Sequence, residues 1–412
     1  MRRVYKKFIV EPNEKANLIT EAFGIDAGYE NVVADLEIPT DYEIMYITGE
    51  SGSGKTTILN EIVKIEEMTI PKEPLFEWGK NQKETLGILT LVGLGDAVLY
   101  LSTYEKLSDS QKARARVALE LLSDKEEIYI DEFLSTLDRK TAKAVAYCIQ
   151  KAIRKLGKKA ILVTAHNDLE GYLMPDVVIE GKAFPSRWEI KYNQVNDKNL
   201  ILEECSFEYV DKVFYRNLRL GELHYKGKYT GGTKEYLAVL LDDDCIGILV
   251  STNRMHDDGR RIARVVIHPS YRGCGIGTAL VREYLRSFPK TDVIAAMALF
   301  NPIFEKAGMD RVNDVQIKPP TGLKKELLRL NFDIDKWFSK TYCNEFTTSL
   351  ENRELLSKYA KNATHLVCPG GKYLDVSEIE EKIENDSITA SRVLWGLRPR
   401  KMAKYVGKRD LI

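Results

Sequence analysis

A glycine-rich octapeptide is the feature that most constrains how this chain folds. Residues 49–56 have the sequence GESGSGKT and lie between the apolar run 43–48 and a helix-like run over 56–66. The glycines let backbone N–H groups close around a phosphate, the lysine reaches the outer phosphate oxygens, and the threonine hydroxyl is a ligand for Mg²⁺. A plain glycine turn is the alternative, but it leaves the later motifs unexplained. The octapeptide therefore predicts a strand, a phosphate-binding loop and a helix in succession.

A second apolar strand ends in two carboxylates. Residues 128–130 (IYI) are followed directly by Asp131 and Glu132. In a nucleotide-hydrolysing site, the first acid holds the Mg²⁺ shell and the second polarises the attacking water. We therefore expect Thr56 and Asp131 to be the metal ligands and Glu132 to be a catalytic residue.

Three more fragments stand in order along the chain. Residues 107–111 (LSDSQ) open a helix with alternating basic and apolar positions, residues 135–138 (STLD) follow the two acids, and His166 ends the run VTAH. Each fragment alone is weak evidence for a function. A single histidine after a strand, for example, is more often structural than functional. Together they resemble the signature motif, D-loop and switch histidine of the ABC-type ATPases, with Walker A at 49–56 and Walker B at 128–132.

The resemblance implies ATP and Mg²⁺ as ligands and His166 as a second catalytic residue that senses the γ-phosphate. The residues expected to bind ATP are Gly49, Ser51, Gly52, Gly54, Lys55, Thr56, Thr57, Ser108, Ser110 and Gln111. Asp109 and Ser110 replace the two glycines of the usual LSGGQ, and an acid beside a γ-phosphate repels it unless it points away. Gln82 is a candidate Q-loop glutamine, and Tyr29 or Phe23 is a candidate for stacking on adenine.

An ABC signature motif acts on nucleotide held by the Walker A loop of another copy. The resemblance therefore implies an ATP-dependent head-to-tail homodimer. The chain has no run of about 18 apolar residues, and its basic first ten residues lack a long apolar core, so we expect neither a membrane span nor a signal peptide. Six scattered cysteines fit a reducing, cytoplasmic location. The 61 basic and 61 acidic residues balance one another, so any contact with nucleic acid requires a local patch of basic residues.

A second glycine-rich loop lies further along the chain. Residues 272–277 (RGCGIG) follow a β-branched strand and a His268-Pro269 turn, and they open a helix over 277–287. Such a loop brings backbone close to a pyrophosphate, and the helix N-terminus adds a favourable dipole and free N–H groups. A dinucleotide fingerprint uses glycines in the same way, but no acidic ribose partner follows about 20 residues later on a second strand.

This loop resembles motif A of the GNAT acyltransferases, (Q/R)xxGxG. A hairpin of 236–241 with 245–250 precedes it, and residues 301–309 resemble motif B, so the resemblance covers roughly 200–316. It implies acetyl-CoA or another acyl-CoA as cofactor, with the thioester polarised by backbone N–H groups of a splayed strand. The residues expected to bind the cofactor are Val266, Ile267, Arg272, Gly273, Gly275, Gly277, Thr278 and Asn301.

The acid and base of the transfer step are not evident. Phe304 stands where many of these enzymes have a tyrosine that protonates the leaving thiolate. Tyr271 and Cys274 lie near the cofactor loop, but we favour structural roles for both. His256 and His268 are candidate bases, and the histidine-proline turn favours a structural role for His268.

The last 96 residues, 317–412, contain no catalytic motif that we recognise. We expect helices over 349–363, 375–385 and 389–406. The second has Asp375 and Glu378 in a capping-box arrangement, and the last is kinked at Pro399 and rich in basic side chains with Trp395 and Tyr405. Such a helix can follow a phosphate backbone and stack on bases, or it can be a solvated face or a docking helix. Cys343, His365 and Cys368 lack the fourth ligand and paired spacing of a zinc site.

The sequence thus predicts an α/β protein with three parts: an ABC-type P-loop ATPase domain (1–185), a GNAT acyltransferase domain (195–316) and a mainly helical, basic region (317–412). The whole resembles archaeal and viral proteins in which an ABC-class ATPase is fused to a GNAT-type acetyltransferase domain. This implies ATP hydrolysis coupled to acyl transfer from acyl-CoA to an amine, on a nucleic-acid base or another macromolecule. The alternative is a nucleic-acid-binding switch ATPase whose GNAT fold senses acyl-CoA without transfer.

Overall fold

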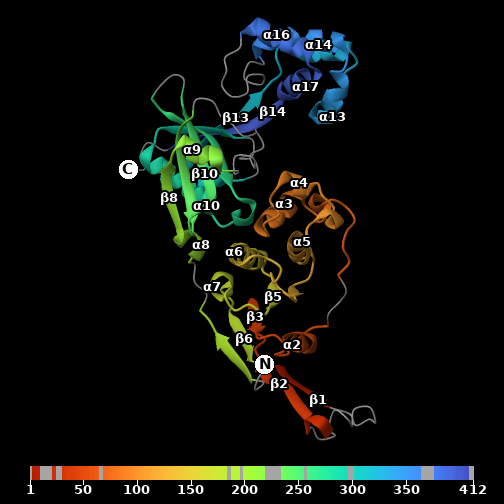
Figure 1. The fold of residues 1–412 in the computed structure, drawn as a ribbon, viewed down its shortest axis with the longest axis vertical. Helices are drawn as coiled ribbons and strands as arrows, with labels where there is room; N and C mark the ends of the chain where they lie inside the picture. The colour runs from red at the N-terminus through yellow and green to blue at the C-terminus, as the bar shows by residue number, and fades with distance from the viewer. Residues whose placement is uncertain are drawn as a thin grey trace. The chain divides into compact units, whose positions relative to one another are not determined.

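The computed structural model describes residues 2–9, 21–24, 30–64, 68–182, 187–194, 198–218, 233–254, 258–295, 301–362 and 375–407. The chain forms two compact units (Figure 1). The first unit consists of Met1–Cys205 together with the short segment His268–Ile276, and the second consists of Ser206–Ile267 and Gly277–Ile412.

A five-stranded sheet is the centre of the first unit. Its strands, in spatial order, are β4 (Glu127–Ile130), β5 (Lys159–Val163), β3 (Ile44–Gly49), β6 (Val177–Lys182) and β7 (Arg187–Tyr192). The first four are parallel, whereas β7 is antiparallel to β6. Strand β3 is buried from Ile44 to Thr48, as a central parallel strand covered on both faces requires.

The other elements of the first unit pack around this sheet or extend from it. They are the hairpin β1 (Arg2–Ile9) and β2 (Glu30–Ile38) and the helices α2 (Lys55–Ile62), α3 (Gln82–Leu91), α4 (Ala97–Tyr100), α5 (Asp109–Leu122), α6 (Arg139–Leu156), α7 (Glu170–Leu173) and α8 (Leu200–Glu203). Helix α6 has the Asp138 side chain as its N-cap, and it ends at Gly157, whose φ of 64° is the left-handed conformation that favours glycine.

Strand β7 lies between the two domains predicted from the sequence. Most of its residues fall in the interval between 1–185 and 195–316, but Arg187–Tyr192 pairs with β6 along its whole length. Its burial alternates between half-buried and exposed positions, because only one face of this edge strand meets the core. Such a strand has too few apolar residues to be recognised without its partner.

The second unit contains a seven-stranded sheet. Its strands, in spatial order, are β13 (Met309–Ile317), β14 (Arg400–Gly407), β12 (Thr291–Ala295), β11 (Arg260–Ile267), β10 (Asp244–Asn253), β9 (Thr233–Leu241) and β8 (Cys205–Val210). Its shorter helices are α9 (Lys212–Asn217) and α11 (Ile303–Lys306), and α10 (Ile276–Ser287) follows the glycine-rich loop. The predicted β9–β10 hairpin is present, and Asp242 and Asp243 turn it with φ values of 46° and 66°.

The segment 389–406 is not one kinked helix. Helix α17 (Ser387–Gly396) ends before Pro399, and β14 then runs between β12 and β13. A proline disfavours helix at the residue before it and lacks an N–H of its own, so the helix cannot continue. Met402, Ala403 and Tyr405 are buried in the sheet. The predicted basic helix, on which the nucleic-acid hypothesis depended, is therefore half helix and half internal strand.

A helical module lies between β13 and β14 in the sequence. It consists of α12 (Leu323–Arg329), a 3₁₀ helix (Ile334–Phe338), α13 (Lys340–Phe346), α14 (Leu350–Ser357), α16 (Val376–Asn385) and α17. The expected helices over 349–363 and 375–385 correspond to α14 and α16, and Asp375 and Glu378 form the predicted capping box.

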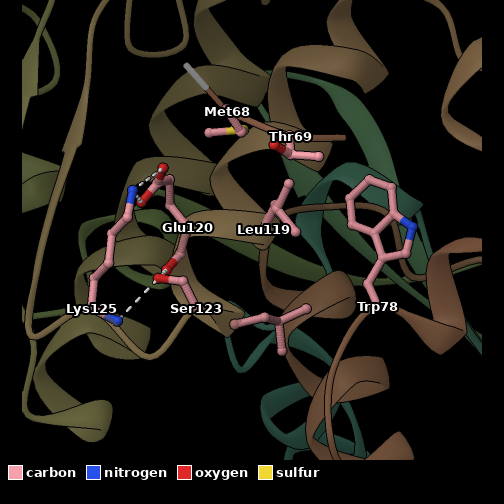
Figure 2. Close-up of a pocket in the computed structure, with 8 residues that line it drawn as sticks. Met68, Thr69, Trp78, Leu119, Glu120, Ser123 and Lys125 are labelled. Carbon is pink, nitrogen blue, oxygen red and sulfur yellow. Dashed lines mark hydrogen bonds and ion pairs between the residues drawn. The ribbon is translucent and has the colours of Figure 1, made fainter. Parts of the chain in front are cut away.

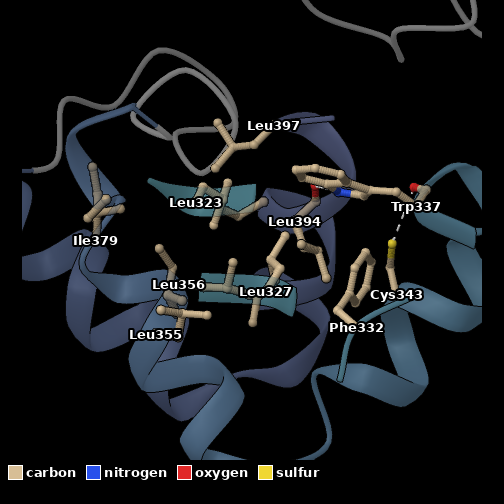
Figure 3. Close-up of a cluster of buried hydrophobic side chains, with 14 residues drawn as sticks. Leu323, Leu327, Phe332, Trp337, Cys343, Leu355, Leu356, Ile379, Leu394 and Leu397 are labelled. Carbon is tan, nitrogen blue, oxygen red and sulfur yellow. Dashed lines mark hydrogen bonds between the residues drawn. The ribbon is translucent and has the colours of Figure 1, made fainter. Parts of the chain in front are cut away.

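The helical module has its own apolar core (Figure 3). Trp337 is fully buried there, and its indole N–H donates to the Leu394 carbonyl over 2.8 Å. Cys343 is buried in the same core, whereas His365 and Cys368 lie outside the described residues. Within the described part of the chain, no helix has the length and apolar character to cross a bilayer.

Removal of β14 tests the fold of the second unit. A chain ending at Pro399 loses both hydrogen-bonded ladders that β14 forms, so we expect the second unit to become sensitive to protease. A chain ending at Gly407 keeps the strand and should resist like the full chain. Limited proteolysis with mass spectrometry compares the two, and equal resistance would contradict the assignment of β14.

Candidate functional site

The parallel strands bring the predicted ATP-site residues to one edge of the first sheet. The loop after β3 contains residues 49–56, the turn after β4 contains Asp131 and Glu132, and the segment after β5 contains His166. Because β5 lies between β4 and β3 and all three are parallel, their carboxyl ends meet at the same edge. Motifs more than 100 residues apart in the sequence are thereby placed on neighbouring strands.

The phosphate-binding loop requires glycine at Gly49. Its φ is 138°, and a Cβ atom there would overlap the carbonyl oxygen of Gly181 on β6. Gly52 and Gly54 also have positive φ values, of 82° and 93°, but a Cβ at Gly52 would meet open space. The close approach to β6 fixes the start of the loop, and the two later glycines supply its left-handed turns.

Lys55 lies across its own loop. Its ammonium donates to the carbonyls of Gly49 and Glu50 over 2.9 and 2.8 Å. Burial lowers the pKa of Lys55, and the nearby charges of Glu132 and Asp131 act in the opposite direction. The ammonium therefore lies within the field of both carboxylates that follow β4.

Thr56 and Asp131 form the pair expected to hold Mg²⁺. The Thr56 hydroxyl donates to an Asp131 carboxylate oxygen over 2.9 Å. Two hard oxygens at this spacing fit Mg²⁺, which takes one or two protein ligands and completes its octahedron with water and phosphate oxygens. The described residues contain no cluster of three or more His, Cys, Asp or Glu side chains suited to a metal.

Ser53 is a residue that the sequence analysis did not single out. Its hydroxyl is buried and has no hydrogen-bond partner among the described residues, although it lies within the phosphate-binding loop. A buried hydroxyl without a partner calls for a polar ligand. It therefore fits the presence of a phosphate in this loop, and no sequence signal beyond the loop itself marks it.

Glu132 has an unusual backbone conformation. Its φ is 53°, and its side chain is exposed at the end of β4. A left-handed backbone at a non-glycine residue costs roughly 1–3 kcal/mol and persists where the surroundings hold it. Here its carbonyl accepts from the backbone N–H and the hydroxyl of Ser135, over 3.2 and 3.0 Å. The D-loop residue Ser135 thus holds the backbone of the predicted catalytic residue.

His166 is held through its backbone. The Tyr46 hydroxyl and the Thr48 hydroxyl both donate to the His166 carbonyl, the latter over 2.9 Å. The segment that follows is tied to α6 by the ion pair of Arg139 with Asp168. These contacts leave the imidazole half-buried at the sheet edge where the other predicted residues lie. Tyr46 and Arg139 carry no motif that would have indicated this role.

The signature residues form the start of α5. Ser108 is the N-cap, and its hydroxyl and backbone N–H are bonded to the backbone N–H and side chain of Gln111 in a capping box. Asp109 is exposed in the first turn, where an acid interacts favourably with the helix dipole. The acid that replaces the first signature glycine thus has a structural reason to be there.

The remaining ATP-site candidates are less defined. Ser51 is exposed in the loop and Thr57 is half-buried in the first turn of α2. Gln82 is exposed at the first position of α3, and Phe23 is 77% exposed. Tyr29 lies outside the described residues.

The glycines of the acyl-CoA loop have different roles. Gly273 and Gly275 have φ values of 93° and 84°, and a Cβ at Gly275 would meet only the Asn199 side chain, at 3.7 Å. A Cβ at Gly277 would lie 2.6 Å from the terminal methyl group of Ile303, so α11 packs closely against α10 at this glycine. The Arg272 guanidinium donates to the Gly95 carbonyl in the same unit.

Strand β11 pairs with strands on both of its sides. Its pairing with β12 is described from Arg260 to Ile262, and its pairing with β10 continues to Ile267. The residues that follow β12 lie outside the described part of the chain, so the splayed strand around Val266 and Ile267 stays a prediction. Thr278 is half-buried in the first turn of α10, and Asn301 is exposed just before α11.

The residues near the expected thiolate position are mainly structural. Phe304 is buried, with its ring 5.5 Å from that of Tyr405 on β14. The His268 imidazole accepts from the Ser270 N–H over 3.4 Å and caps a 3₁₀ turn (Pro269–Tyr271), and burial lowers its pKa. Tyr271 is buried beside it. His256 lies outside the described residues.

A small cavity lies at the C-terminal end of α5, in the first unit (Figure 2). Its volume is about 310 Å³, and Met68, Trp78 and Leu119 form part of its wall. The Glu120 and Lys125 side chains in its wall form an ion pair at 3.2 Å. None of the predicted nucleotide-binding residues lines it.

Comparisons with known proteins agree with both halves of this description. Residues 199–302 match the acetyltransferase (GNAT) family. The methionine import ATP-binding protein MetN 1 of Lactiplantibacillus plantarum is 40% identical over 85 residues, which are 20% of this chain and 23% of the relative. MetN of Lacticaseibacillus paracasei is 32% identical over 108 residues, which are 26% and 30% of the two chains. The chain thus spans less than a third of these curated relatives.

Among solved structures, the dimeric, post-hydrolysis ATP-binding cassette MJ0796 bound to ADP and Pi matches with a TM-score of 0.32 and 18% identity. The match covers 45% of this chain and 95% of that one. The match to the GNAT family and the similarity to the MetN proteins indicate an ABC-type ATP-binding region joined to a GNAT acetyltransferase domain. The resemblance and the α/β fold class predicted from the sequence are confirmed.

Two glycine substitutions test the loop geometry. Gly49→Ala places a methyl group against the Gly181 carbonyl, so we expect ATP affinity to fall by about tenfold or more, or about 1.4 kcal/mol. Gly52→Ala is the matched control, since its φ is also positive but its Cβ meets open space. Titration with a fluorescent ATP analogue measures both, and an equal loss in the two variants would contradict the role of the Gly181 contact.

Proposed function

We propose that this protein hydrolyses ATP in a head-to-tail homodimer and transfers an acyl group, most simply acetyl, from acyl-CoA to an amine. The ATPase part rests on one observation, the Thr56–Asp131 pair formed at the sheet edge that also carries Lys55 and Glu132. The acyltransferase part rests on the match of residues 199–302, which include the glycine-rich loop 272–277, to the GNAT family.

In the ATPase, Thr56 and Asp131 would hold Mg²⁺, which neutralises charge on the phosphates when bound. Lys55 binds the outer phosphate oxygens, and Glu132 orients the attacking water. His166 contacts the γ-phosphate from the end of β5. Ser108 and Ser110 of one copy face the nucleotide held by the other, which makes the active form a dimer.

In the acyltransferase, backbone N–H groups near Val266 and Ile267 polarise the thioester carbonyl. The acceptor nitrogen forms a bond to the carbonyl carbon, the carbon–sulfur bond breaks, the nitrogen loses a proton and the CoA thiolate gains one. Phe304 cannot supply that proton. A small free amine needs no ATP-driven dimer for this reaction. We therefore favour an acceptor that is part of a macromolecule, such as a nucleic-acid base. Closure of the dimer would grip that macromolecule.

Phe304 also favours a second candidate function slightly. A GNAT fold that binds acyl-CoA without a proton donor suits a sensor, in a switch ATPase that binds nucleic acid. Release of free CoA distinguishes the two functions, because only transfer produces it. A thiol assay with cell extract as the acceptor source, followed by mass spectrometry of protein and nucleic acid, measures that release and identifies the acceptor.

Glu132→Gln tests the ATPase proposal. The amide cannot polarise water, so hydrolysis should fall by about 100-fold or more while ATP still binds. The closed dimer should then accumulate, and size-exclusion chromatography at saturating ATP should show twice the monomer mass. Glu132→Gln combined with Lys55→Ala is the control, and it should stay monomeric. A Glu132→Gln chain that remains monomeric would refute the head-to-tail dimer.

Gly275→Glu tests the acyl-CoA loop. It places a carboxylate at a left-handed position beside the expected pyrophosphate, so the affinity for acetyl-CoA should fall by about tenfold or more. Gly157→Glu makes the same change at another left-handed glycine with open space, at the end of α6, and should leave that affinity unchanged. Calorimetry with acetyl-CoA measures both. Unchanged affinity in Gly275→Glu would mean that the loop has another role.

A further inference from the structure

Two arginines of the first unit donate to the same short turn. The turn Gly93–Asp96 follows α3, and Arg114 of α5 reaches it from the side of the signature motif. Arg114 is only 8% exposed, and its guanidinium donates to the Gly93 carbonyl over 2.9 Å and to the Ser110 carbonyl over 3.1 Å. The buried Arg114 guanidinium thus connects Ser110 of the signature motif to the turn.

The second arginine comes from the predicted acyl-CoA loop. Residues 268–276 belong to the first unit, and Arg272 donates to the Gly95 carbonyl two residues beyond the carbonyl that Arg114 uses. Burial lowers the pKa of Arg272, and the charge of Asp96 opposes that effect. A guanidinium has no acceptor capacity and five N–H donors, so a buried one is fixed in place by the carbonyls around it.

Helix α6 makes a second connection to the same loop. The thiols of Cys148 and Cys274 are both buried and lie 3.4 Å apart, and the Cys274 sulfur is 3.5 Å from the Ala144 carbonyl. A Cβ at Gly273 would lie 3.0 Å from both the Cys148 sulfur and the Leu91 side chain. The loop is therefore packed closely against α6, which begins at the D-loop residue Asp138.

We propose that the Gly93–Asp96 turn, held by Arg114 and Arg272, couples the ATP signature motif to the acyl-CoA loop, so that closure around ATP raises the affinity for acyl-CoA. The inference rests on the proposed function. Contact of the Ser110 backbone with nucleotide fixes the start of α5 and the Arg114 that is bonded to it. A fixed turn then holds Arg272 and the loop in one conformation. Less conformational entropy of the loop is then lost when acyl-CoA binds. Arg272 acts here as a positioning residue.

The coupling is measured in the Glu132→Gln chain, where ATP is bound and not consumed. Acetyl-CoA affinity is determined by calorimetry without nucleotide and with saturating ATP and Mg²⁺. Coupling of this kind corresponds to about a 5- to 150-fold tighter binding. By linkage, saturating acetyl-CoA must tighten ATP binding by the same factor, so the reciprocal titration tests the coupling without any further substitution.

Arg114→Met tests the route. Methionine keeps an unbranched apolar stem but removes both hydrogen bonds, so the affinity for acetyl-CoA without ATP should stay unchanged while the ATP-dependent gain disappears. Arg116→Met is the matched control, since Arg116 lies on the same helix and donates instead to the Tyr104 hydroxyl over 2.8 Å. It should retain the full gain.

If acetyl-CoA does not bind the parent chain under any condition, the proposed acyltransferase function fails. If acetyl-CoA binds but ATP does not change its affinity, the coupling is refuted and the proposed function stands. If ATP raises the acetyl-CoA affinity of Arg114→Met and Arg116→Met by the same factor, the turn does not couple the two sites. Should Arg114→Met fail to fold, the reciprocal titration still decides whether the sites are coupled.

Discussion

The parallel pairing of β5 with both β3 and β4 is the constraint on which the ATP site depends. It aligns three carboxyl ends at one edge, so that the Thr56 hydroxyl after β3 reaches the Asp131 carboxylate after β4. Each parallel pair of this sheet closes a long loop, and the ordering entropy of such loops must be offset by burial of the strands. The fully buried β3 supplies much of that burial, and the contact of Gly49 with β6 fixes the loop relative to it.

The sequence predicted those features that short motifs determine. The phosphate-binding loop, the strand before Asp131, the β9–β10 hairpin and the Asp375–Glu378 capping box each depend on residues within a few positions of one another. Strand β7 was not predicted because it has few apolar residues, and β14 was not predicted because the strands that stabilise it lie far away in the sequence. The residues of β14 pair with Asp292–Ala295, over 100 positions earlier, and nothing within 400–407 encodes that partner.

The contacts of a single side chain, that of Arg272, also could not be predicted from the sequence. A family motif indicates where a backbone loop lies and which ligand it suits, but it does not indicate what else its side chains contact. The Gly95 carbonyl that Arg272 meets is 177 positions earlier in the sequence. The hydrogen bond to this carbonyl offsets part of the cost of burying the guanidinium, independently of any phosphate. The motif match and the observed contact are thus separate facts, and only the structure provides the second.

Phe304 and β14 together define what is unusual in the acyltransferase unit. Phe304 replaces the tyrosine that would protonate a thiolate, and its ring packs against Tyr405. The Tyr405 hydroxyl donates to Glu305 over 3.0 Å, and burial together with that carboxylate raises the pKa of Tyr405. Because Tyr405 belongs to β14, the wall behind Phe304 is built by the C-terminal strand. The helical module between β13 and β14 is therefore an insertion into the sheet of the second unit, and the strand that follows the module carries the Tyr405 ring that packs against Phe304.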